Sequence, residues 1–445
     1  MGDMIDGSAD RRIERSVEES ADGGSDPSLR RVPAPTIRRP SRRLPTFSAF
    51  RHRNFSIFFA GYVVSLVGVW MQRVAQSWLV LDLTDSAFYV GLVDALGSLP
   101  VLAFSLYAGA IADRVSKHRM VIVTQASAML VALGFAAMMV TGLERIGLVI
   151  ALAALLGVAT AFDIPARQSF FVEIVGKEDL PSAIALNSSA FNATRLVGPA
   201  IAGILIGAVG VAACFLANGL TYLAVLAALL AMRLPSSRPR ARPSTSAWTN
   251  IREGLEYVRS DPRVRALLLN IAVMSVFGLP ALVLLPVLAK NVLGRGAQEY
   301  GWMMSAVGGG ALIGALAVAT FATVMPKGRV LGWAAILFGL LVAALGLVQS
   351  VAAALVVLTG LGAALITMTA LTNTLLQTLA PDHLRGRVIS VYTLAFVGMA
   401  PFGSLGAGVA AERLGVPVAL AIGGLVTALF AALGAARARE LRATR

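Results

Sequence analysis

The stretch 55-FSIFFAGYVVSLVGVWMQRVAQSWLV-80 decides the fold of this chain. A helix needs about 20 predominantly apolar residues to cross a hydrocarbon core of about 30 Å, and this stretch is long enough. Eleven further apolar stretches of similar length follow it, separated by short polar breaks. The sequence therefore predicts an all-α membrane protein with twelve transmembrane helices.

The predicted spans are approximate at their ends. They cover residues 55–80, 88–112, 119–140, 146–164, 183–208, 212–232, 266–289, 300–323, 330–348, 352–379, 387–409 and 417–436.

Composition supports a membrane protein and excludes a soluble globular protein, a disordered protein and a collagen-like protein. Of the 445 residues, 57% are hydrophobic and only 14% are charged, whereas about 25% charged is usual for a globular domain. The single cysteine, Cys214, has no partner for an intrachain disulfide. With only three histidines, His52, His118 and His383, a zinc site is not expected. We expect no metal and no cofactor.

The distribution of positive charge predicts the orientation. With the N-terminus inside, 32 of the 38 Lys and Arg residues fall in inside segments, and four fall outside: Arg145, Lys290, Arg295 and Arg413. The positive-inside rule favours this arrangement, with both termini in the cytoplasm and the chain in the inner membrane. Because the net charge of +14 is spread over short loops, we do not expect nucleic acid as a partner.

The chain divides into five predicted parts. Residues 1–53 hold eleven Arg and eight acids and are predicted to be a disordered cytoplasmic tail without a cleaved signal peptide. The basic end of this tail is interpreted as a positive-inside anchor or, alternatively, a lipid-surface contact. The other parts are an N-terminal six-helix bundle (54–232), a linker (233–265), a C-terminal six-helix bundle (266–436) and a short cytoplasmic tail (437–445).

The linker contains one amphipathic segment. Trp248, Ile251, Leu255 and Val258 follow one another at helical spacing, which predicts a helix lying on the inner membrane face. Weak similarity between 168–203 and 377–408 favours an internal duplication, as in transporters built from two parallel repeats.

The loop after the second span carries a motif. Gly109-Ala-Ile-Ala-Asp113-Arg114-Val-Ser116-Lys117-His118-Arg119 resembles the loop signature of the major facilitator superfamily, with Ser116 in place of the usual glycine. The resemblance implies two six-helix bundles, and it implies that Gly109, Asp113, Arg114, Lys117 and Arg119 hold the inner face closed while the cavity opens outward. Asp113 can meet the positive end of the helix that begins near Arg387. The alternative is an ordinary helix end with snorkelling cations.

The fifth span carries a second resemblance. Gly198-Pro199-Ala-Ile-Ala202-Gly203 is similar to the Gly-Pro-x-x-Gly-Gly element of superfamily antiporters and exporters, although the same residues also suit helix packing alone. Residues 70–78, 162–168 and 187–195 resemble a bacterial exporter group that includes enterobactin exporters, macrolide efflux pumps and a lysophospholipid flippase. This resemblance does not identify the cargo.

Charged residues within spans cost at least ~2.5 to 3.5 kcal/mol each, and three of them stand out: Arg73, Asp94 and Arg195. Arg73 and Asp94 are equally far from the turn between the first two spans, so we expect them at one depth as a pair or short polar network. Their pairing is interpreted as a structural salt bridge or as a proton-coupling device centred on Asp94. Asp163 is a second candidate relay, or a helix terminator bonded to Arg167.

Two polar helix faces are candidate walls of a substrate cavity. Ser188, Asn192, Arg195 and Pro199 share one face of the fifth span. The second face belongs to the tenth span and consists of Thr369, Asn373 and Gln377. The first span adds three further candidates, Trp70, Gln72 and Gln76. The alternative for the Thr and Asn residues is helix-to-helix bonding. The apolar remainder of the spans favours an amphipathic cargo.

The leading function is a proton-coupled exporter of amphipathic small molecules of drug or siderophore type. Its expected partners are the small substrate, protons and the lipid bilayer, and we expect a monomer. The alternative is a lipid flippase without proton coupling. The sequence contains no His-x-x-x-His metal pair, no Gly-x-Ser-x-Gly elbow and no Gly-x-x-x-x-Gly-Lys-[Ser/Thr] loop, so an enzyme is not expected. A sensor or scaffold without transport is a further alternative.

Overall fold

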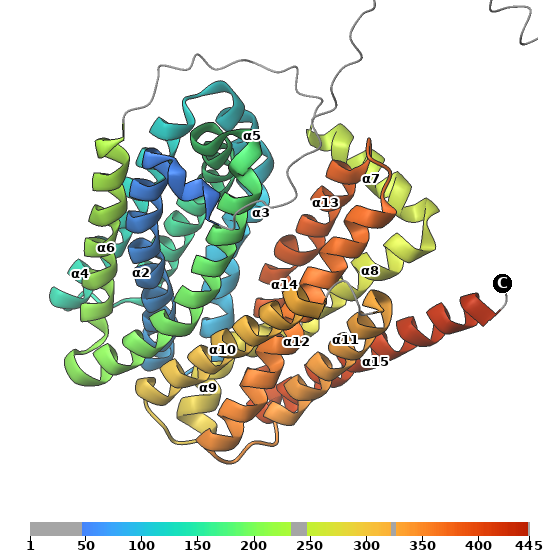
Figure 1. Ribbon diagram of the computed structural model, residues 1–445. Coiled ribbons are helices and arrows are strands. Elements are labelled where there is room, and N and C mark those ends of the chain that lie inside the picture. The colour runs from blue at the N-terminus through green and yellow to red at the C-terminus, as the bar shows by residue number, and fades with distance from the viewer. Residues whose placement is uncertain (1–46, 233–246, 322–325, 444–445) are drawn as a thin grey trace, which may run out of the picture. The chain divides into compact units, whose positions relative to one another are not determined.

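The computed structural model describes residues 47–232, 247–321 and 326–443, and over these residues it is helical, with no strand (Figure 1). Eleven of the described helices are long and apolar enough to cross a membrane. One of them, α5 (Ile146–Val209), contains both the fourth and the fifth predicted span, which accounts for the difference from twelve. The prediction of an all-α membrane fold is confirmed.

The N-terminal bundle consists of long, nearly uninterrupted helices. Its members are α2 (Arg53–Thr84), α3 (Ala87–Arg114), α4 (Lys117–Val140), α5 and α6 (Val211–Ala231). The predicted polar break over 165–182 lies within α5, which is helical on both sides of a single kink. Gly176 takes a φ of 71° at that kink, a conformation that a residue without Cβ adopts at little cost.

The C-terminal bundle contains more interruptions. Its elements are α8 (Pro262–Val273), η2 (Met274–Gly278), η3 (Leu279–Leu282), α9 (Leu285–Val287), η4 (Leu288–Val292), α10 (Ala297–Phe321), α11 (Lys327–Leu345), α12 (Val351–Leu379), α13 (Arg385–Thr393), η5 (Leu394–Gly398), α14 (Ala400–Leu414) and α15 (Val416–Ala443). The predicted span 266–289 therefore changes helix type several times. Pro280 and Pro286 lie in it and lack the backbone N–H that a regular helix needs.

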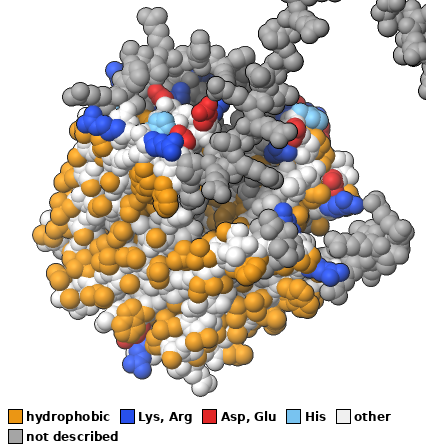
Figure 2. Space-filling model, in the orientation of Figure 1, with side chains coloured by type: hydrophobic (Ala, Val, Ile, Leu, Met, Phe, Trp, Pro, Cys, Tyr) orange, Lys and Arg blue, Asp and Glu red, His pale blue; other side chains and the backbone are white. Residues whose placement is uncertain are grey.

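Consecutive helices run in opposite directions, so the molecule has two distinct ends. We call the end that carries Arg114, Lys117 and α7 (Ala247–Ser260) the basic end, and the end that carries the turns at Asp85, Gly210 and Gly415 the turn end. Figure 2 shows hydrophobic side chains over the middle of the visible face and most of its charged side chains gathered at the basic end.

The two bundles contact each other strongly at the turn end. Lys290 Nζ lies 3.5 Å from a carboxylate oxygen of Asp82 and 3.3 Å from one of Asp85. The Ser86 hydroxyl donates a hydrogen bond of 2.9 Å to Glu412. Backbones also approach closely here, because a Cβ at Gly408 of α14 would stand 2.9 Å from the Ala87 carbonyl oxygen of α3. Figure 1 shows the bundles diverging from this end toward the basic end.

The tail prediction needs a correction at its C-terminal end. Residues 1–46 lie outside the described part, but η1 (Ser48–Arg51) is ordered and packs on α5. Ala49 is fully buried, its N–H donates to Ser182 Oγ at 3.2 Å, and His52 Nε2 lies 2.8 Å from Asp179. A short helix forms because its two small residues fit against α5.

The structure adds detail to two further predicted helices, the linker helix and the last span. The amphipathic helix α7 is formed, and it packs on the C-terminal bundle: Glu253 forms an ion pair with Arg387, and the Tyr257 hydroxyl donates to the Leu379 carbonyl at 3.2 Å. The side chains of Trp248 and Ile251 lie outside the described part. At the other terminus, the apolar stretch Val416–Ala436 of α15 agrees with the predicted span 417–436, and the helix continues beyond it to Ala443.

Candidate functional site

A cavity of about 820 Å³ lies among the helices of the N-terminal bundle. Its walls come from α2, α3, α4, α5 and α6, and Val397 of η5 is its one lining residue from the C-terminal bundle. Its volume is in the range of small-molecule sites, which is about 300 to 1,000 Å³. The lining mixes apolar residues such as Val69, Val90 and Phe171 with ionisable ones.

The cavity gathers part of the predicted site. Trp70, Gln72, Gln76 and Ser188 line it, together with the three proton-coupling candidates Arg73, Asp94 and Asp163. The other candidates are not among its lining residues; these are Asn192, Arg195, Thr369, Asn373 and Gln377.

The candidates on α12 bond within their own helix. The Thr369 hydroxyl donates to the Leu365 carbonyl at 2.9 Å, and Gln377 Nε2 donates to Asn373 Oδ1 at 2.5 Å. Asn192 of α5 does the same, since its amide donates to the Ser188 carbonyl at 2.9 Å. Their contribution to a substrate site stays a prediction.

Asp94 makes a contact between the bundles. Ser404 Oγ, on α14, donates a hydrogen bond of 2.6 Å to Asp94 Oδ2, on α3. A short bond from a hydroxyl to a carboxylate is stronger than one between neutral groups. Asp94 thus belongs both to the cavity wall and to the contact between the bundles.

Arg73 does not pair with Asp94, and this prediction is corrected. Its guanidinium carbon lies 5.3 Å from the centre of the Trp70 ring, and in the described part of the chain no carboxylate is at ion-pair distance from it. Equal distance from the turn between α2 and α3 places both residues at one depth, but it does not set the direction of their side chains around the helix axes. Asp94 is turned toward α14, and Arg73 is turned along Trp70.

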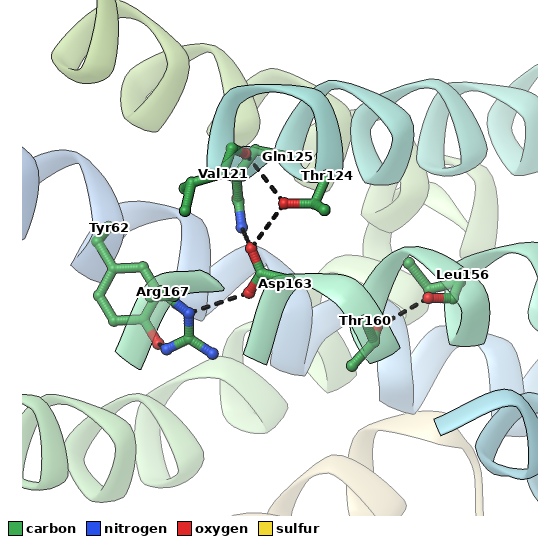
Figure 3. Close-up of polar contacts among 8 residues, drawn as sticks. All are labelled: Tyr62, Val121, Thr124, Gln125, Leu156, Thr160, Asp163 and Arg167. Carbon is green, nitrogen blue, oxygen red and sulfur yellow. Dashed lines mark hydrogen bonds and ion pairs between the residues drawn. The ribbon is translucent and has the colours of Figure 1, made fainter. Parts of the chain in front are cut away.

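A second polar network surrounds Asp163 (Figure 3). Its Oδ2 accepts from Arg167 Nε at 3.0 Å, and its Oδ1 accepts from Thr124 Oγ1 at 2.9 Å and from Gln125 Nε2 at 2.8 Å. Arg167 also donates to the Tyr62 hydroxyl. The expected bond to Arg167 is present, but Asp163 does not end its helix, because α5 continues beyond it.

The predicted gating loop is a tight connection between α3 and α4. Ser116 caps α4, its hydroxyl accepting from the Arg119 N–H at 3.5 Å, and Arg114 and Arg119 are exposed. Lys117 is half-buried, and no heavy atom lies within 4 Å of where a Cβ of Gly109 would stand. The side chain of Asp113 lies outside the described part, so its role stays a prediction.

We expected Asp113 to meet the helix that begins near Arg387, and Arg387 itself has another ionic partner. Arg387 of α13 forms an ion pair with Glu253 of α7, within the C-terminal bundle and its linker.

The Gly-Pro element of α5 lies at close helix contacts. A Cβ at Gly198 would stand 2.6 Å from the Trp70 Cβ, and a Cβ at Gly203 would stand 2.8 Å from the Gln298 carbonyl oxygen. The Pro199 carbonyl oxygen would be 2.5 Å from a Cβ at Gly301 of α10. The absence of a Cβ at Gly198 therefore lets α5 approach α2, and its absence at Gly203 and Gly301 lets α5 approach α10.

Several residues of the site escaped the sequence analysis. Thr124 and Gln125 are partners of Asp163, Ser404 is the partner of Asp94, and Tyr62 accepts from Arg167. Asn218 donates to Gln72 Oε1 at 2.5 Å. Polar residues inside apolar spans were a usable signal for Thr124, Gln125 and Asn218. No local signal distinguishes Tyr62 or Ser404.

The chain matches known families over most of its length. The sequence model of MFS_3, described as transmembrane secretion effector, matches residues 44–444. A staphyloferrin A transporter of Staphylococcus aureus is 26% identical over 372 residues, which are 83% of this chain and 92% of that protein. The multidrug efflux pump Tap of Mycolicibacterium fortuitum is 29% identical over 77% of this chain and 85% of its own length. An enterobactin exporter of Shigella boydii is 26% identical over 80% of this chain and 86% of its own length.

Solved structures agree with the fold. A POT family transporter in complex with 5-aminolevulinic acid aligns with a TM-score of 0.69 at 12% identity, covering 86% of this chain and 95% of that one. At this identity the likeness concerns the arrangement of helices alone.

Proposed function

Because the chain belongs to the MFS_3 family of major facilitator transporters, the transmembrane secretion effectors, we propose that it exports amphipathic small molecules across the cytoplasmic membrane by proton antiport. It is a transporter and not an enzyme, as its family and its relatives are transporters. The observation that carries the proposal is the cavity, which combines apolar walls with an acid, Asp94, that also contacts the other bundle.

The cargo is of drug or siderophore type. The relatives include a multidrug efflux pump and an enterobactin exporter, which support export of such molecules, and a staphyloferrin A transporter. The lining of the cavity fits this class, because apolar side chains and a few polar groups surround one space.

The basic end faces the cytoplasm. Positive-inside counting supports this orientation, because most Lys and Arg residues outside the spans belong to segments at that end. The bundles meet at the turn end through Lys290, Glu412 and their partners, so this conformation corresponds to an exporter closed toward the outside. Export then requires a second conformation in which these contacts separate, as in alternating access. One chain supplies both bundles, and the protein works as a monomer.

Proton coupling operates through Asp94. The carboxylate accepts the Ser404 hydroxyl in its charged form, and protonation would remove the charge that strengthens this bond. The weaker bond would favour separation of α3 from α14 at the turn end. Proton uptake from outside and opening toward the outside are thereby linked. Asp163 is held by Arg167, Thr124 and Gln125 and serves as a second relay.

Inverted membrane vesicles test this function. The vesicles are acidified inside and carry the wild-type protein, Asp94→Asn or the control Glu144→Gln, which neutralises an exposed acid outside the cavity. Lipophilic cations, macrolides, siderophores and lysolipids are then added while the pH gradient is recorded. We expect at least one compound to collapse the gradient with the wild type and the control but not with Asp94→Asn.

Other outcomes would change the proposal in defined ways. Equal collapse with Asp94→Asn would assign the coupling to another group. If no compound moves protons while labelled lysolipid crosses the bilayer, antiport is wrong and the protein is a lipid flippase.

A further inference from the structure

Two arginine side chains lie beside one indole ring near the middle of the N-terminal bundle. The guanidinium carbon of Arg73, on α2, is 5.3 Å from the centre of the Trp70 ring, and that of Arg195, on α5, is 5.7 Å from it. Each is attracted by the ring, but the two positive charges repel each other. A pair of like charges in a membrane span is unstable without a negative partner.

The acids that line the cavity do not supply that partner. Asp94 accepts from Ser404, and Asp163 accepts from Arg167, Thr124 and Gln125. In the described part of the chain neither Arg73 nor Arg195 has a carboxylate at ion-pair distance. The positive charge around Trp70 is therefore uncompensated in this conformation.

Buried hydrogen-bond donors around the same ring also lack partners. Arg195 is 8% exposed and Trp70 is 5% exposed, yet Arg195 Nε and Trp70 Nε1 make no hydrogen bond. Leaving a buried donor unpaired costs about 1 to 3 kcal/mol. Such donors require an explanation in a folded protein, and an absent ligand is one.

Ser305 of α10 adds a third such group. Its hydroxyl is buried without a partner, and it lies between Gly301 and Gly308 on one helix face. A Cβ at Gly308 would stand 2.6 Å from the Arg195 carbonyl oxygen, so this face of α10 packs directly on α5 beside Arg195. Both bundles thus contribute unpaired donors to this region.

We propose that Trp70, Arg73 and Arg195 form a subsite for the anionic head group of an amphipathic cargo, with a carboxylate or another oxyanion between the guanidinium groups. This inference rests on the proposed export function and names its substrate class. Guanidinium groups bind oxyanions through two parallel N–H donors, which gives geometric selectivity as well as energy. The apolar part of the cargo lies along Val69 and Phe191, which line the cavity next to Trp70.

The test uses one amphiphile with and without its charge. Purified protein in phosphatidylcholine nanodiscs is titrated at pH 8.5 with 11-(dansylamino)undecanoic acid and with its methyl ester, and signals from empty nanodiscs are subtracted. We expect the acid to bind at least about tenfold more tightly than the ester, because hydrogen bonds to charged groups contribute about 1.5 to 3 kcal/mol.

Variants assign the effect to the subsite. Arg73→Gln should lower the affinity for the acid about tenfold and leave that for the ester unchanged, while Arg73→Lys should retain part of the selectivity. Arg195→Gln should behave like Arg73→Gln, and binding of the ester reports whether the variant is folded. Arg145→Gln removes the same charge at an exposed turn and should change neither affinity.

The result that overturns the inference is equal affinity of the wild type for acid and ester, or an equal loss of both in Arg73→Gln. If the acid is selected and lysophosphatidylglycerol displaces it at a lower concentration than unlabelled undecanoate does, the anion site stands and a lipid is its source. Equal affinities together with drug-dependent proton flux would leave the export function intact. Acid-selective binding without flux of any compound would preserve the subsite and remove the function.

Discussion

The two bundles hold charge very differently. Within its predicted spans the N-terminal bundle contains Arg73, Asp94, Asp163 and Arg195, and Arg167 lies one helical turn beyond Asp163. The interiors of the C-terminal predicted spans contain no Asp, Glu, Lys or Arg residue. The C-terminal bundle instead offers neutral groups to its neighbour, among them Ser404 and the glycines of α10. The ionisable residues of the spans are thus concentrated in the N-terminal bundle.

This difference has a physical consequence. A buried charge needs a partner, so the N-terminal bundle depends on specific ion pairs and hydrogen bonds. The C-terminal bundle depends on apolar packing and on helices that approach through glycine. Substitutions of similar size should therefore have unequal effects in the two halves.

The largest effect is expected at Asp163. Asp163→Ala leaves the Arg167 guanidinium without its carboxylate and should destabilise the protein by about 3 kcal/mol. Thermal unfolding of purified protein in micelles measures this. Thr369→Ala of α12 is the control from the other bundle, because its hydroxyl bonds only within its helix, and it should cost less than about 1 kcal/mol. Asp163→Asn combined with Arg167→Gln should recover most of the loss, and no recovery would contradict the pairing.

The packing of glycine against the other bundle comes next. A Cβ at Gly408 would stand 2.9 Å from the Ala87 carbonyl oxygen, whereas no heavy atom lies within 4 Å of a Cβ at Gly406 on the same helix. Gly408→Ala should therefore cost about 1 to 3 kcal/mol by overpacking, and Gly406→Ala should cost nothing. Unfolding midpoints of both variants in denaturant give the comparison. Equal midpoints would mean that the turn end tolerates separation of α3 and α14.

A smaller effect is expected for the bond between Asp94 and Ser404. In a double-mutant cycle of Asp94→Asn and Ser404→Ala, the coupling energy should be about 1.5 kcal/mol, the value for a hydrogen bond to a charged group. Unfolding free energies of the four proteins measure it. A coupling energy near zero would show that the two residues do not stabilise the contact between the bundles.

The smallest effect is expected at the exposed ion pairs of the turn end. Lys290 lies between Asp82 and Asp85, whose side chains are 63% and 71% exposed, so Lys290→Gln should cost only about 0.5 kcal/mol. Salt screens such pairs, and the cost should disappear in concentrated NaCl. Arg295→Gln, an exposed cation without an ion pair among the described residues, is the control. A cost that persists at high salt would indicate that Lys290 acts by packing.

Much of the fold could be predicted because membrane helices obey a local rule. Each span must satisfy its own backbone hydrogen bonds and must be apolar over about 20 residues. Both properties depend only on consecutive residues of the chain. The predicted spans agree with helices of the structure for this reason. The predicted break over 165–182 between two spans is itself helical apart from Gly176, because the helix accommodates Pro165 and Pro181.

The site was less predictable than the spans. Arg73, Asp94 and Asp163 stand out in the sequence as charged residues in apolar surroundings, and all three line the cavity together with Trp70. Their partners were assigned less well, since Asp94 contacts Ser404, 310 positions away, rather than Arg73.

Patterns in consecutive residues are enough to predict a helical membrane protein with two bundles and to place its charged residues along the chain. Hydropathy and charge are sums over neighbouring residues, so they need no knowledge of packing. Helix packing sets three further features: Asp94 faces α14, Asp163 and Arg167 connect α4 to Tyr62, and Arg73 and Arg195 lie beside one indole ring. The direction of a side chain around its helix axis depends on which distant helices pack against it, and that choice is made by the whole bundle.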